Sequence, residues 1–191
     1  MTINGSMALA IVIALIVGII LGALAIYISQ QARTRRLKQH FGPEYERTLA
    51  ETGNRSRAEA MLEHRRKRVE HLDIRTLAPN ERAHFQEGWR EVQARFVDNP
   101  SGALNEADRL LGEVMSVKGY PMQEFEQRAA DISVDHPRVI ENYREAHLIA
   151  VRNAQGSATT EELRKAMLHY RALFEELVGQ TEWSQAERIR L

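Results

Sequence analysis

Residues 7–28 have the sequence MALAIVIALIVGIILGALAIYI, a run of 22 residues without a charged side chain. As an α-helix this run is about 33 Å long at about 1.5 Å per residue, and the hydrocarbon core of a bilayer is about 30 Å thick. A helix of a small soluble domain needs one apolar stripe and not an apolar surface on every side. The sequence therefore predicts one transmembrane helix over residues 7–29, after a short tail over residues 1–6.

The charges beside the span predict its orientation. The tail has no basic residue, whereas Arg33, Arg35, Arg36 and Lys38 follow the span. Basic flanks are retained in the cytoplasm, so we expect a single-pass protein of the cell membrane with a cytoplasmic C-terminal part. The alternative is a signal peptide cleaved near Ala23-Leu24-Ala25, which would leave a secreted or periplasmic helical protein. The missing basic N-terminal region and the length of the apolar run argue against cleavage.

Small residues recur every four positions in the span, at Ala10, Ala14, Gly18 and Gly22. This spacing places them on one helix face, where they allow two helix backbones to approach closely. The stripe predicts a homodimer through the transmembrane helix. The alternative is that alanine and glycine are simply common in membrane helices.

The charges of the remaining chain are unevenly distributed. Residues 33–68 carry eleven Lys and Arg against five Glu, whereas residues 69–191 carry fifteen basic and twenty-one acidic residues. Basic residues near a bilayer are attracted to anionic headgroups. The predicted lipid contacts are Arg33, Arg35, Arg36, Lys38, Arg65, Arg66, Lys67 and Arg68. For the run 65–68, the interleaved Glu59, Glu63 and Glu70 favour a solvated helix face with ion pairs, so nucleic acid is not an expected partner.

The chain after the span has helical periodicity throughout and no convincing strand alternation. The predicted fold is all-α: a basic juxtamembrane helix and linker over residues 30–53, a bundle of about five or six helices over residues 54–178, and a polar tail over residues 179–191. Gly42-Pro43 is expected to interrupt the juxtamembrane helix. The predicted core faces include Phe85, Trp89, Val92 and Phe96, at spacings of four, three and four.

Several local signals predict where helices begin. Ser56 with Glu59 and Thr159 with Glu162 match the capping box, in which two side chains satisfy free backbone N–H groups. Pro79 and Pro121 are each expected at a first helical position. Asp135 is expected to cap a helix that starts at Pro137.

No chemical site is predicted. The chain has no cysteine, no Gly-rich phosphate loop, no HExxH and no GxSxG, and its seven histidines are scattered. The pairs Asp131/Asp135 and Tyr143/His147 are each one turn apart and are expected to form local hydrogen bonds or caps. Asp135 could alternatively orient the ring of His136, as in acid–base sites. We expect no catalytic residue, no cofactor and no metal.

Five segments of the chain carry a resemblance to a family. They are FGPEY at residues 41–45, RFVDNP at 95–100, FEQRAAD at 125–131, VDHP at 134–137 and HYRALF at 169–174. With these segments the chain resembles a family of uncharacterised bacterial proteins that have an N-terminal hydrophobic segment and a helical domain. The family has no assigned activity, so the resemblance implies an architecture and no functional residue. Ala78 departs from the family, which has a capping residue before the helix.

Three classes of function remain. The leading hypothesis is a membrane-anchored, non-enzymatic module that binds another protein or itself, and it predicts apolar surface left exposed on the packed domain. The second is a module that lies on anionic lipid through residues 33–68. The third, an enzyme, would need a deep pocket where carboxylate and histidine side chains converge.

Overall fold

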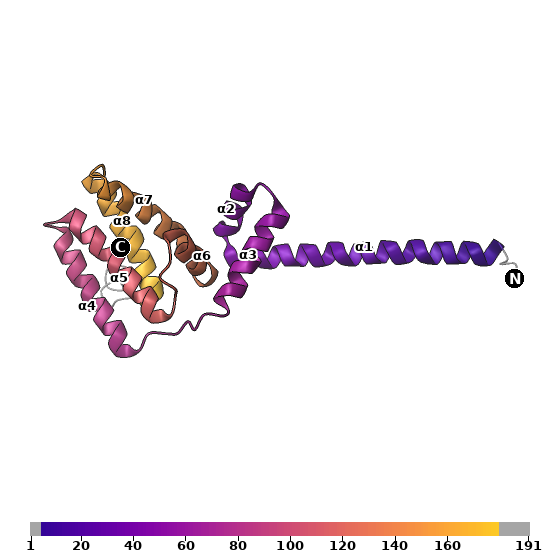
Figure 1. Cartoon of the computed structure of the whole chain (residues 1–191), viewed down its shortest axis with the longest axis horizontal. Helices are drawn as coiled ribbons and strands as arrows, with labels where there is room; N and C mark the ends of the chain where they lie inside the picture. The colour runs from indigo at the N-terminus through magenta and orange to yellow at the C-terminus, as the bar shows by residue number, and fades with distance from the viewer. Residues whose placement is uncertain (1–4, 180–191) are drawn as a thin grey trace, which may run out of the picture. The chain divides into compact units, whose positions relative to one another are not determined.

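The computed structural model describes the backbone of residues 5–179 and the side chains of residues 13–179. All regular structure in this part is helical (Figure 1). The helices are α1 (Gly5–Phe41), α2 (Pro43–Thr52), α3 (Arg55–Val69), α4 (Pro79–Phe96), α5 (Pro100–Lys118), α6 (Phe125–Asp135), α7 (Ile140–Ala154) and α8 (Thr160–Val178). The chain divides into two units, Met1–His40 and Phe41–Leu191. The predicted polar tail lies outside the described residues, apart from Gly179.

Helix α1 contains both the predicted span and the predicted juxtamembrane helix without a break. Among the described residues its apolar stretch, within Ile13–Phe41, has a mean hydropathy of 2.3 and is not buried. The helix is therefore long enough and apolar enough to cross a membrane. The basic residues at its C-terminal end also suit the negative end of a helix dipole.

Glycine and proline separate α1, α2 and α3 as expected. Gly42 has a φ of +51° and Pro43 is the first residue of α2, while Gly53, with a φ of +61°, ends α2. The predicted capping box of Ser56 and Glu59 is wrong. Asn54 caps α3 instead, because its side chain accepts a hydrogen bond of 3.0 Å from the backbone N–H of Arg57.

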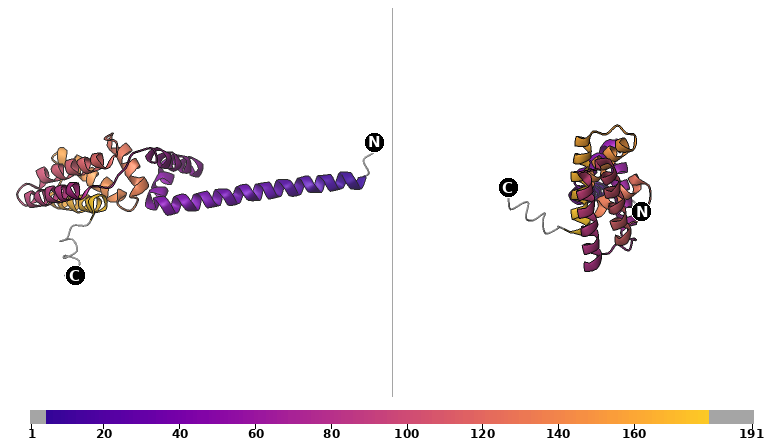
Figure 2. Two further views of the ribbon diagram at one scale, coloured as in Figure 1. Left: turned by 90° about the horizontal axis from the view of Figure 1, so that it is seen from below. Right: turned by 90° about the vertical axis from the view of Figure 1, so that its left-hand side faces the viewer.

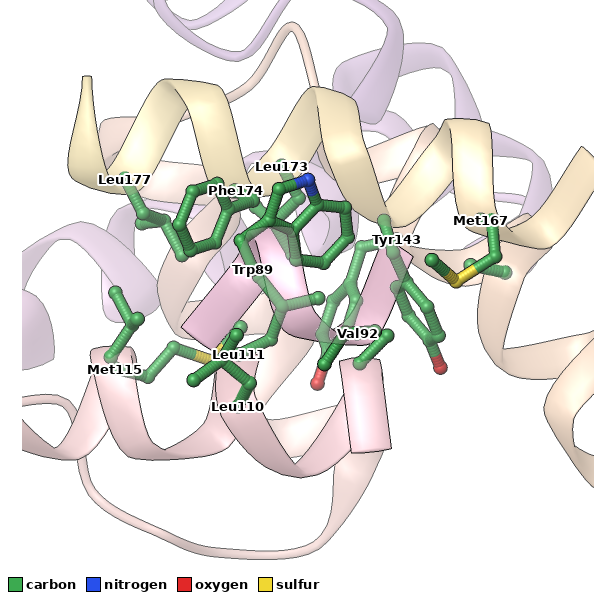
Figure 3. Close-up of a cluster of buried hydrophobic side chains, with 14 of the residues drawn as sticks. Trp89, Val92, Leu110, Leu111, Met115, Tyr143, Met167, Leu173, Phe174 and Leu177 are labelled. Atoms are coloured by element: carbon green, nitrogen blue, oxygen red, sulfur yellow. The ribbon is translucent and has the colours of Figure 1, made fainter. Parts of the chain in front are cut away.

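Four helices of the second unit, α4, α5, α7 and α8, pack around one core (Figures 1 and 2). Short connections make α4 with α5 and α7 with α8 two antiparallel pairs. Trp89 of α4 stacks on Phe174 of α8 at a centroid distance of 4.7 Å in the middle of this core (Figure 3). The predicted core face of α4 is confirmed, since Phe85, Trp89 and Val92 are buried and Phe96 packs against the cluster.

A second group of helices lies beside this bundle. Helices α2 and α3 form a hairpin, and α3 contacts α6. The predicted boundary between linker and bundle, at residues 53 and 54, is in the turn of this hairpin. Within residues 54–178 the structure has six helices, α3 to α8, and α2 precedes them in the segment predicted as linker.

The connection between α5 and α7 differs from the prediction. Helix α6 begins at Phe125 and not at Pro121, because the N–H of Gln123 bonds to the carbonyl of Pro121 in a tight turn. Asp135 does not cap α7. Its carboxylate accepts a hydrogen bond of 2.8 Å from the Tyr120 hydroxyl, and α7 begins only at Ile140 without a side-chain cap.

Candidate functional site

A groove of about 580 Å³ lies on the second unit between α3, α6 and α7. Its basic lining residues are Arg57, His64, Arg65, Arg68 and Arg144, and its acidic ones are Glu51 and Glu126. Ala60, Met61, Ala130 and Gln127 complete the lining. We refer to these eleven residues as the α3 groove.

The helical repeat of α3 explains why its basic residues share one wall. Arg57, Met61, His64, Arg65 and Arg68 follow one another at intervals of four, three, one and three residues, so their side chains lie on one helix face. The prediction of a cationic run at residues 65–68 missed this pattern. The signal that could have found it is the periodic recurrence of cations from residue 57 onward.

Buried ion pairs hold the groove walls together. Glu44 of α2 has a side chain only 1% exposed, and its Oε1 accepts hydrogen bonds from Arg65 Nη1 at 2.7 Å and from Arg144 Nη2 at 2.9 Å. Arg144, itself 7% exposed, also donates Nη1 to Glu126 Oε2 at 2.9 Å. Glu44 therefore joins α2, α3 and α7 through one oxygen atom.

A second ion pair joins α3 to α6. Arg68 Nε donates to Asp131 Oδ1 at 2.8 Å, and Gln127 Nε2 donates to the same oxygen at 3.3 Å. The Asp131 side chain is 2% exposed. The predicted local pairing of Asp131 with Asp135 is thus not what the structure shows, because each carboxylate bonds to a distant residue.

Two buried polar atoms next to these pairs have no hydrogen-bond partner in the described part of the chain: Glu44 Oε2 and Arg144 Nε. A buried polar group without a partner costs about 1–3 kcal/mol. Seven other buried side-chain atoms of the described residues also have no partner, but only these two belong to the ion pairs beside the groove.

The eight predicted lipid contacts occupy two different environments. On α1, the side chains of Arg33, Arg35, Arg36 and Lys38 are exposed. On α3, three of the four basic residues are in ion pairs within the chain: Arg65 with Glu44, Arg68 with Asp131, and Arg66 with Glu63 and Glu70. Lys67 is exposed. Contact with lipid remains a prediction for all eight.

The small-residue stripe of α1 is open. Ala14, Gly18 and Gly22 are exposed, and a Cβ built on either glycine meets no heavy atom within 4 Å. The side chain of Ala10 lies outside the described residues. Pairing of two spans through this face remains a prediction.

Other titratable side chains are in structural contacts. His147 stacks on Phe125 at a centroid distance of 3.5 Å, and burial lowers its pKa. His136 Nδ1 lies 3.1 Å from Glu176 Oε1, so its carboxylate neighbour is not Asp135. Within residues 13–179 no group of three or more His, Asp or Glu side chains is placed to hold a metal ion.

Comparison of the chain with protein-family models, curated proteins and solved structures finds no match.

Proposed function

We propose that this protein is a single-pass membrane protein whose helical unit binds a partner protein through the α3 groove. The proposal rests on the observation that one chain combines an exposed apolar helix of spanning length with a folded unit that has an arginine-lined groove. The helix supplies the anchor and the groove supplies the contact surface. No enzymatic role is proposed.

Exposed apolar side chains on the folded unit support an interaction role. Met61, Val97, Met122, Leu148, Val151 and Leu168 are between 39% and 82% exposed. Single exposed apolar residues are common on protein surfaces. Met61 is the one of these six that lines the α3 groove, so an apolar contact and several cations occur at the same place.

Photo-crosslinking in membranes tests this role. A photoreactive amino acid replaces Met61 in the full-length chain, and the control carries it at Val97, which is 82% exposed in the turn between α4 and α5. We expect a discrete crosslinked product from position 61 and none from position 97. If neither position, or both equally, gives a product, the groove is not the partner site.

The proposed orientation places the helical unit in the cytoplasm, because the basic residues follow the span. A fluorescent protein fused to the C-terminus should therefore be fluorescent, and a fused alkaline phosphatase should be inactive. The opposite result would reverse the orientation. Detection of a secreted product that begins after Ala25 would show that the apolar segment is a cleaved signal peptide and not a membrane anchor.

A second candidate function is binding to an anionic membrane surface. It is favoured by the exposed side chains of Arg33, Arg35, Arg36 and Lys38 at the end of α1. Residues 33–191 should bind phosphatidylserine vesicles in a salt-sensitive way, and replacing these four residues by glutamine should weaken binding more than Arg66→Gln with Lys67→Gln. Binding that does not depend on lipid charge would contradict this function.

A further inference from the structure

We propose that the α3 groove binds an acidic peptide segment of the partner, with carboxylates on its arginines and an apolar side chain against Met61. This inference rests on the proposed function, since it names the chemistry of the partner. It commits to a protein segment and not to lipid, nucleic acid or a free anion.

The size and floor of the groove suit a short peptide segment. Its volume of about 580 Å³ is within the range of about 300–1,000 Å³ that is typical of ligand sites. Ala60 and Met61 of α3 and Ala130 of α6 supply apolar lining. An apolar side chain that covers Met61, which is 39% exposed, would gain free energy by leaving water.

The α3 wall offers oriented donors for carboxylates. Arg65 uses Nη1 for Glu44, and Arg68 uses Nε and Nη2 for Asp131, so buried acids hold both guanidinium groups in place. A guanidinium has five N–H donors, which leaves further donors on each. Because these two arginine side chains are already ordered, they would lose little conformational entropy when a ligand binds.

Arg57 is the cation in the groove that is most available. Its side chain is exposed, and within residues 13–179 it has no ion pair, whereas the three other groove arginines each have at least one. It lies one helical turn before Met61, so a carboxylate on Arg57 and an apolar residue on Met61 can belong to one short segment.

Arg144 adds an independent indication of a missing acceptor. Its side chain is 7% exposed and lines the groove, and its Nε has no hydrogen-bond partner in the described residues. A buried donor without an acceptor lowers the stability of the fold.

The acidic residues of the groove limit the charge of the ligand. Glu51 and Glu126 line it, and Glu126 is 75% exposed. Buried Glu44 and Asp131 already pair with Arg65, Arg144 and Arg68, so within the described residues Arg57 is the groove arginine whose charge is not yet paired, and a polyanion such as nucleic acid would carry more charge than the groove can neutralise. A segment with few carboxylates next to an apolar residue matches the mixed lining better.

Fluorescence anisotropy tests the proposal on the full-length chain in nanodiscs of neutral phosphatidylcholine. The probe is a fluorescein-labelled peptide of alternating glutamate and leucine, and its control has glutamine in place of glutamate. The variant is Arg57→Glu. The matched control variant is Arg82→Glu, which changes an exposed arginine of α4 that has no ion pair among the described residues.

We expect the glutamate peptide to bind, and the glutamine peptide and Arg57→Glu each to weaken binding by about tenfold or more. Arg82→Glu should bind like the unchanged chain, and circular dichroism should show that both variants are folded. No binding, equal binding of both peptides, or an equal effect of the two variants overturns the proposal. If position 61 gives a crosslink but peptide binding does not depend on charge, the proposed partner-binding function still holds. Only the inference that the bound segment is acidic is then rejected.

Discussion

At the scale of single residues, buried charge is the main difference between this domain and a purely apolar bundle. Glu44 lies in a short, polar helix whose residue pattern does not predict burial, yet its side chain is only 1% exposed. Its position depends on Arg65 and Arg144, which are 21 and 100 residues away along the chain. No local pattern could have predicted this contact.

Replacing Glu44 by alanine should destabilise the fold strongly. The change leaves Arg65 and Arg144 buried without their shared acceptor, and breaking a buried pair costs about 3–5 kcal/mol. We expect a loss of about 3 kcal/mol, measured by urea unfolding of the full chain in detergent micelles. The control is Glu87→Ala, which removes an exposed pair with Arg90 and should cost less than about 0.5 kcal/mol. Equal effects would show that the Glu44 pairs do not stabilise the fold.

Glu81 gives a prediction about pH. Hydrogen bonds from Arg75 and from the backbone N–H of Ala78 lower the pKa of Glu81 from 4.5 to about 2. A carboxyl whose pKa is lowered in the folded state stabilises the fold when the pH is above the pKa of that carboxyl in the unfolded state. This stabilisation is lost as the pH falls toward 2. Glu81→Gln should therefore have a lower melting temperature than the unchanged chain at pH 7, and the difference should shrink between pH 4.5 and 2. A difference that does not change with pH would exclude this carboxylate as the cause.

At the scale of helices, the local signals succeeded where a helix end depends on neighbouring residues. Thr159 and Glu162 form the expected capping box, and Gly119, with a φ of +100°, ends α5. Ala78 offers no side-chain cap, but Glu81 accepts the backbone N–H of Ala78 at 2.8 Å, which is the other half of a capping box. The signals failed at Ser56 and Asp135, because Glu59 is held by Tyr45 and Arg55 and Asp135 by Tyr120. They failed also at Pro121, since α6 begins only at Phe125.

Gly119→Ala should disturb the connection between α3 and α4. A Cβ at this position would lie 2.3 Å from the carbonyl oxygen of Asp73, so the backbone at Asp73 must move in addition to the strain of a positive φ. The control is Gly156→Ala, where φ is +68° and no heavy atom lies within 4 Å. We expect the control to cost about 1–2 kcal/mol and Gly119→Ala to cost more, measured by the same unfolding experiment. A smaller cost at Gly119 would contradict the close approach.

At the scale of the whole molecule, the open prediction is the pairing of two spans. Gly18→Ile with Gly22→Ile fills the stripe on α1 with bulky side chains, which should keep two helices apart. We expect a lower signal in a membrane-association reporter assay of residues 1–40. The control replaces Ile16 and Ile20 by leucine, which keeps the side-chain volume and leaves the stripe unchanged. An unchanged signal from the glycine variant would remove the dimer hypothesis.

The sequence by itself determined the apolar helix of spanning length, the all-α class and the helix starts at Pro43, Pro79 and Thr160, because each depends on residues within a few turns of one another. Only the tertiary structure decided which polar residues are buried and where the α3 groove lies. Arg57, Met61 and Arg65 form a wall of that groove because α6 and α7 lie opposite them, and Arg144 reaches Glu44 across 100 residues of chain. Such contacts come from long-range packing, which residue spacing along the chain does not encode.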